Sequence, residues 1–126
     1  MIKLFLFICI SSVLFSCKTK TSEQNPAKAK QLYSEGMKIL DNRIHTTSNQ
    51  NAIELNNKAI EKFTAAYNAD TSFRDAALFA SECTMYGKDY QQCIYWTTKL
   101  ISLDTSQQNI NFCNERLEYC KKQLHP

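Results

Sequence analysis

Hydrophobic residues recur every three or four positions along most of this chain, which is the spacing of amphipathic helices. The first helical segment runs from Pro26 to about Arg43, and Asn25 in front of it is a typical helix cap. A polar connector over residues 44–51 leads to a second segment, which ends before Asp70. The apolar positions of these two predicted helices are Leu32, Tyr33, Gly36 and Leu40, followed by Ile53, Leu55, Ala59, Ile60, Phe63, Ala66 and Tyr67.

The same spacing predicts three further helices. Ser72 and Asp75 form a capping pair for the third helix, which Gly87 closes, and Asp89 opens the fourth. The fifth begins near Ser106 and has one apolar and one polar side, as expected of a helix that closes a stack. The apolar positions are Ala76, Phe79, Ala80, Cys83 and Tyr86; then Tyr90, Cys93, Ile94, Thr97, Leu100 and Ile101; then Ile110, Cys113, Leu117, Cys120 and Leu124.

The composition supports a single all-α domain. Two glycines and two prolines in 126 residues are too few for the many tight turns of a sandwich or barrel. The 15 Lys and Arg residues are scattered among 12 Asp and Glu residues, whereas nucleic-acid-binding proteins concentrate basic residues in a patch. We therefore predict one helical domain over residues 26–126 that does not bind nucleic acid.

The second and fourth predicted helices repeat one another at a spacing of 34 residues. The matching pairs are Ala59 and Cys93, Ile60 and Ile94, Ala66 and Leu100, Tyr67 and Ile101, Asp70 and Asp104, and Thr71 and Thr105. A helix, a turn and a helix repeating at this period resemble the tetratricopeptide repeat. The first repeat differs from the second in holding about eleven extra residues between its helices.

This resemblance implies antiparallel helix pairs stacked as a short α-solenoid with a C-terminal capping helix. It also implies a concave groove along the first helix of each pair, where a peptide or protein partner binds. The residues expected to line this groove are Tyr33, Met37, Leu40, Leu78, Glu82, Met85, Phe112, Arg116 and Tyr119. The alternatives are that several of these side chains complete a small core, and that the domain is an unrelated helical bundle.

The amino terminus predicts export and lipid attachment. A short basic start precedes a mostly apolar run that is too short to cross a bilayer permanently and is typical of a secretory signal. The run ends in Leu14, Phe15, Ser16 and Cys17, which resembles the lipobox of bacterial lipoproteins. The resemblance implies that residues 1–16 are removed as a signal peptide and that Cys17 carries the lipid. An ordinary signal followed by a chance cysteine is the alternative.

The residues after the lipid site indicate where the domain is held. Residues 17–25 are polar and lack hydrophobic periodicity, so we expect a flexible tether. In enteric bacteria, an aspartate directly after the lipidated cysteine resembles a signal for retention in the inner membrane. This chain has Lys18 at that position. The early, Phe-rich signal and the Asn-rich, Lys-rich body resemble proteins of the Bacteroidota, whose surface lipoproteins often carry an acidic run after the cysteine. This chain lacks such a run. By analogy, we expect the cell envelope, at the outer membrane and facing the periplasm.

The placement of cysteine and histidine residues does not indicate catalysis or a metal site. The four cysteines after Cys17 lack the close pairs of zinc sites, and His45 and His125 have no recognisable catalytic setting. Cys83 and Cys93 stand at matching heights on either side of a predicted turn, so we predict a disulfide between them. Buried free thiols are the alternative.

These features predict a non-catalytic interaction module that is anchored to a membrane and binds a protein or peptide. Neither a cofactor nor a small-molecule substrate is predicted, because two isolated glycines cannot form a phosphate-binding loop. The alternative function is a structural subunit of a larger envelope assembly, in which the helices pack permanently against another protein.

Overall fold

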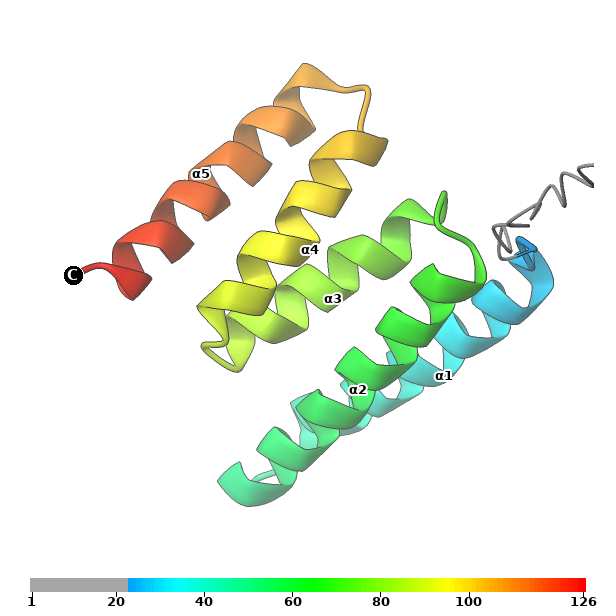
Figure 1. Ribbon diagram of the computed structural model, residues 1–126. Coiled ribbons are helices and arrows are strands. Elements are labelled where there is room, and N and C mark those ends of the chain that lie inside the picture. Colours follow the sequence, from blue (N-terminus) through cyan, green and yellow to red (C-terminus); the bar gives the residue numbers. More distant parts are fainter. Residues whose placement is uncertain (1–22) are drawn as a thin grey trace, which may run out of the picture.

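Five helices follow one another in the structure, a computed structural model that describes residues 23–126. They are α1 (Pro26–His45), α2 (Asn49–Ala69), α3 (Arg74–Tyr86), α4 (Tyr90–Leu103) and α5 (Gln107–Leu124), and residues 23–126 contain no strand. Each helix packs against the next, and the stack grows in chain order from α1 to α5 (Figure 1). The prediction of an all-α fold built from stacked antiparallel helix pairs with a closing helix is confirmed.

The predictions for the amino terminus lie outside the described residues. They are the signal peptide over residues 1–16, the lipid on Cys17 and most of the tether over residues 17–25. Within the described part of the chain, no helix combines the length and the apolar character needed to cross a membrane.

Two of the predicted helix caps are confirmed. Asn25 Oδ1 accepts a hydrogen bond from the backbone N–H of Lys28 at 3.0 Å, at the start of α1. Asp89 Oδ1 accepts one from the backbone N–H of Gln92 at 3.1 Å, at the start of α4. Each cap satisfies one of the N–H groups that a helix leaves free in its first turn.

The predicted capping pair of Ser72 and Asp75 is wrong. Helix α3 begins at Arg74 with Phe73 in the cap position, and no side chain caps it. The Ser72 hydroxyl donates instead to Asp70 Oδ1 at 2.6 Å, and the Ser72 backbone N–H donates to the same oxygen at 3.0 Å. These two bonds hold Ser72 in the turn after α2, and its hydroxyl does not cap α3.

The extra residues of the first repeat lengthen its helices. α1 exceeds α3 by seven residues (20 against 13), and α2 exceeds α4 by seven (21 against 14). Seven residues add about 10 Å of helix, so the first pair projects beyond the α3–α4 turn (Figure 1). The polar connector predicted over residues 44–51 is therefore too long. Ser48 Oγ accepts from the Asn51 N–H at 3.3 Å, and this cap makes the following polar residues the first turn of α2.

The repetition at 34 residues is visible in the burial of α2 and α4. Ala59 and Cys93 are both completely buried, and Asp70 and Asp104 are the C-cap residues of their helices. Equivalent positions in the two helices therefore have equivalent surroundings, as expected when one supersecondary unit is stacked on another.

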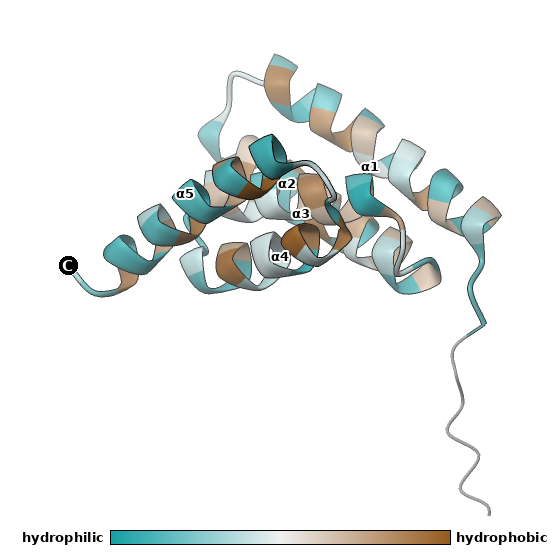
Figure 2. Cartoon of the chain, turned by 90° about the horizontal axis from the view of Figure 1, so that it is seen from above, coloured by the Kyte–Doolittle hydropathy of each residue, from teal (hydrophilic) through white to brown (hydrophobic). Residues whose placement is uncertain are grey.

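The core between α1, α2 and α3 is rich in aromatic rings. Phe63 is completely buried, and its ring centroid lies 5.7 Å from that of Tyr33 and 5.5 Å from that of Phe79. Hydrophilic residues cover the outer side of α5, which suits a helix that closes the stack (Figure 2).

Candidate partner-binding face

The first helix of each pair and the closing helix are connected by side-chain contacts. The Tyr33 ring of α1 contacts the Phe79 ring of α3, with centroids 5.8 Å apart. Arg116 of α5 donates a hydrogen bond from Nη1 to Ser81 Oγ of α3 at 2.8 Å and forms an ion pair with Glu82. These contacts join α1 to α3 and α3 to α5. We call the combined surface of α1, α3 and α5 the first-helix face.

The nine residues predicted to line a groove differ in accessibility. Leu40 and Arg116 are each only 7% exposed, which corrects their assignment to a groove. Leu40 belongs to the hydrophobic core, and Arg116 points inward to Ser81. Three further side chains, those of Tyr33, Met37 and Leu78, are half-buried and pack against the core. The alternative of a core role therefore describes Leu40, whereas a groove role for Tyr33, Met37 and Leu78 stays a prediction.

The other four predicted residues form two neighbouring strips on the first-helix face. Glu82, Phe112 and Tyr119 are exposed, and Met85 is half-buried. Phe112 and Tyr119 stand four residues before and three after Arg116, so the three share one side of α5. Glu82 and Met85, three residues apart, share one side of α3. The ion pair between Arg116 and Glu82 brings the two strips together.

The two exposed rings of the α5 strip are held by neighbouring side chains. The guanidinium carbon of Arg116 lies 4.8 Å from the centre of the Phe112 ring, within the range of a cation–π contact. The Tyr119 ring meets that of Tyr90 edge to face, with centroids 6.1 Å apart. Phe112 is nonetheless 52% exposed and Tyr119 45% exposed. A partner would meet rings that are already oriented, which lowers the entropy lost on binding.

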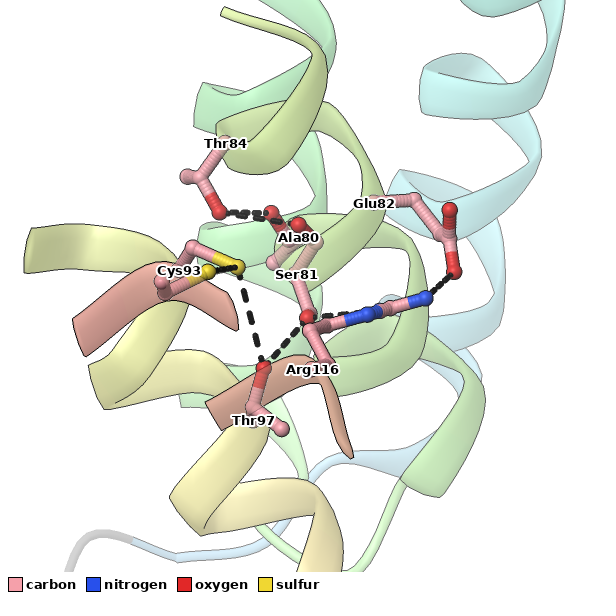
Figure 3. Close-up of polar contacts among 8 residues, drawn as sticks. Ala80, Ser81, Glu82, Thr84, Cys93, Thr97 and Arg116 are labelled. Carbon is pink, nitrogen blue, oxygen red and sulfur yellow. Dashed lines mark hydrogen bonds and ion pairs between the residues drawn. The ribbon is translucent and has the colours of Figure 1, made fainter. Parts of the chain in front are cut away.

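A buried polar network positions Arg116 (Figure 3). Ser81 Oγ, which accepts from Arg116, lies 2.7 Å from Thr97 Oγ1 of α4, and Thr97 Oγ1 lies 3.8 Å from Cys93 Sγ. Ser81 and Thr97 are completely buried. A buried guanidinium without partners is strongly destabilising, and here Ser81 and Glu82 supply them. This network could not be predicted from the sequence, because small hydroxyl residues at core spacing look like ordinary packing positions.

A second accessible surface, which sequence reasoning missed, lies where the first helix pair projects beyond the second. Ile44, Ile53 and Tyr86 are exposed there. A cavity of about 410 Å³ is lined in part by Ile53 and Tyr86, together with Ala52, Asn56 and Gly87. This surface was missed because residues 44–51 were predicted to be a polar connector. A polar loop gives no reason to expect apolar side chains that are held in place by helices.

The four described cysteines are buried and free. The disulfide predicted between Cys83 and Cys93 is not formed. Although the two residues flank one turn, Cys83 Sγ lies 3.9 Å from Arg43 Nη1, whereas Cys93 Sγ faces Cys120 Sγ at 3.1 Å. Burial raises the pKa of Cys83 to about 11 and that of Cys120 to about 12. Both thiols are therefore protonated at neutral pH, which makes them weak nucleophiles.

Two further findings concern the function of the protein. Within residues 23–126, no group of three or more His, Cys, Asp or Glu side chains is arranged to hold a metal ion. No protein-family model, curated protein or solved structure matches the chain. We therefore infer function from the geometry of the first-helix face and from the pattern of the amino terminus.

Proposed function

We propose that the protein is a lipid-anchored, non-catalytic interaction module whose first-helix face binds a segment of a partner protein. The observation that carries this proposal is the pair of strips formed by Glu82 and Met85 on α3 and by Phe112 and Tyr119 on α5. Aromatic residues and Met are enriched at recognition surfaces, and Met adapts to irregular ligands.

The chemistry of the two strips indicates an apolar or mixed peptide as the ligand. Phe112 and Tyr119 offer apolar ring surface. The single carboxylate on the strips, that of Glu82, is already paired with Arg116. Arg116 is buried and paired as well, so it is not free to bind the carboxylate of an acidic peptide. A segment that places apolar side chains on the rings and a hydrogen-bond donor near Glu82 fits best.

The amino terminus supports the membrane anchor in this proposal. The apolar run that ends at Cys17 fits cleavage before this residue and attachment of lipid to its thiol. Two or three acyl chains on one residue hold a protein durably at a membrane, whereas a single chain holds it weakly. We propose the outer membrane, with the domain facing the periplasm on a short polar tether.

A structural subunit of a larger envelope assembly is the second candidate. The observation that favours it is the accessible apolar surface at the projecting end, where the exposed side chains of Ile53 and Tyr86 line a cavity of about 410 Å³. A permanent neighbour would bury these side chains, since contiguous exposed apolar surface commonly marks a protein–protein contact.

Site-specific photo-crosslinking in the native cell separates the two candidates. A photoreactive phenylalanine analogue replaces Tyr119, Tyr95 or Ile53 in the full-length, tagged protein. Tyr95 is the matched control, because it is an exposed tyrosine of similar accessibility (48% against 45%) on α4. We expect a protein adduct from position 119 and none from position 95. An adduct from position 53 without one from position 119 would favour the assembly, and equal adducts at all three positions would contradict both.

A further inference from the structure

Two cysteines from different helices meet inside the closing half of the stack. Cys93 Sγ of α4 and Cys120 Sγ of α5 lie 3.1 Å apart, although the residues are 27 positions apart in sequence. Both side chains are completely buried. The sulfur atoms of a disulfide are separated by about 2.05 Å, so the two thiols need to approach by only about 1 Å. We propose that Cys93 and Cys120 are a dithiol–disulfide site that covalently joins α5 to α4.

The other described cysteines have different neighbours. Cys83 Sγ faces Arg43 Nη1 at 3.9 Å. Cys113 lies on the same helix as Cys120 and is buried to the same extent, and Asp104, Arg116 and Arg74 are among the charged groups that act on its thiol. Cys113 is therefore a matched control for Cys120, because it is equally buried on α5 and has these charged neighbours.

The buried pair reacts only after the closing helix opens. Burial raises the pKa of Cys120 to about 12, so the thiolate is scarce while α5 is docked. Among the described helices, α5 packs mainly against α4, and a helix with a single main neighbour separates locally at low cost in free energy. In the opened state water reaches both sulfurs, and the pKa of the Cys120 thiol returns toward about 8.5.

The oxidant is a disulfide, either oxidised glutathione or a protein disulfide. One of the two thiols, as the thiolate, attacks a sulfur of the oxidant and forms a mixed disulfide, releasing one thiolate. The second cysteine thiolate then attacks the protein sulfur of the mixed disulfide and releases the second thiolate. Two electrons pass from the cysteine pair to the oxidant, and the two released thiolates take up the two protons that the cysteines lost.

The bridge fixes the helix that carries the exposed rings of Phe112 and Tyr119. It closes a loop across the α4–α5 turn, and this restricts the unfolded chain and suppresses the separation of α5 from α4. The inference is independent of the proposed function, since it rests on the contact between Cys93 and Cys120 alone.

Peptide mapping of the full-length protein tests this site. Trypsin cleavage after Arg74, Lys88, Lys99, Arg116 and Lys121 places Cys83, Cys93, Cys113 and Cys120 in four separate peptides. The reduced protein is incubated with oxidised glutathione, alkylated and digested without reductant. We expect the peptides of Cys93 and Cys120 to be linked in the wild type and in Cys113→Ser, and unlinked in Cys120→Ser.

Thermal unfolding gives a second measurement that does not depend on digestion. Oxidation should raise the unfolding temperature of the wild type and of Cys113→Ser by at least about 5 °C and leave that of Cys120→Ser unchanged. Alkylation of both Cys93 and Cys120 after oxidation of the wild type would overturn the proposal. Linkage of Cys93 or Cys120 to Cys83 or Cys113, with a yield equal to that of the Cys93–Cys120 linkage, would overturn it as well. Both results come from the wild type, so neither requires a variant that folds.

Discussion

Adding one methyl group to Gly36 tests how tightly α1 packs against α2. A Cβ atom built on Gly36 would lie 2.7 Å from Phe63 Cε1 and 3.0 Å from Phe63 Cδ1. Carbon atoms pack favourably only at about 3.5 to 4.0 Å. The ring has no room to retreat, because Phe63 is completely buried, with Tyr33 and Phe79 at centroid distances of 5.7 and 5.5 Å.

Two effects of opposite sign decide the result of Gly36→Ala. Within a helix, alanine is more favourable than glycine by about 1 kcal/mol. Overpacking of a filled core costs about 1 to 3 kcal/mol. Because Phe63 is enclosed by other rings, we expect the packing effect to win and the free energy of unfolding to fall by about 1 to 2 kcal/mol.

Thermal unfolding followed by circular dichroism measures this change. For a domain of this size, a loss of 1 kcal/mol lowers the unfolding temperature by about 4 to 8 °C. Phe63→Leu is the partner variant, because its smaller side chain makes room for the added methyl group. In the Phe63→Leu background, Gly36→Ala should become neutral or stabilising, which a double-mutant cycle reports as a coupling energy. A Gly36→Ala protein that is more stable than the wild type would refute the packing argument.

Three further predictions concern a cap, an ion pair and the anchor. Asn25→Ala removes the cap of α1 and should lower the free energy of unfolding by about 1 kcal/mol in a denaturant titration. Hydrogen bonds from Arg74 lower the pKa of the Asp104 carboxyl, so its contribution to stability is complete above about pH 4 and is lost as the pH falls through the lower folded-state pKa. Asp104→Asn should therefore destabilise by about 1 to 2 kcal/mol at pH 7, and unfolding curves against pH should show this difference shrinking below about pH 4. Cys17→Ser should move the protein from the membrane to the soluble fraction after fractionation, and unchanged partitioning would remove the lipid anchor from the proposal.

The helices of this protein were predictable because their signals are local. The apolar spacing and the caps at Asn25 and Asp89 involve residues within four positions of one another. All five helices form, and both of these caps lie where expected. The repetition at 34 residues in the sequence is also present in the structure, because Ala59 and Cys93 are buried at equivalent positions of equivalent helices. The extent of α1 and α2 was missed, since the cap at Ser48 extends helix through residues that look like a loop.

The accessibility of the first-helix face was only partly predictable, because it depends on contacts between distant residues. Spacing places Phe112, Arg116 and Tyr119 on one side of α5 but does not say which of them turns inward. Arg116 is buried because Ser81 and Glu82 of α3, more than thirty positions earlier, supply partners for its guanidinium.

The cysteine pairing failed for a similar reason. Matching height across the α3–α4 turn is set by local sequence, whereas the direction in which each sulfur points is set by the helices on either side. Cys83 Sγ points toward Arg43 of α1, whereas Cys93 Sγ points toward Cys120 of α5.

The central claim is tested most directly by measuring how tightly the captured partner binds two variants of this protein. One variant combines Phe112→Ala and Tyr119→Ala on the first-helix face, and the other is Tyr95→Ala on α4; all three side chains are exposed to a similar degree. Both are measured as full-length protein, with thermal unfolding in parallel. The proposal predicts that the double variant loses at least about tenfold in affinity at an unchanged unfolding temperature, while Tyr95→Ala binds as the wild type does. Undiminished binding by the double variant, or an equal loss in Tyr95→Ala, would contradict a partner-binding role for the first-helix face.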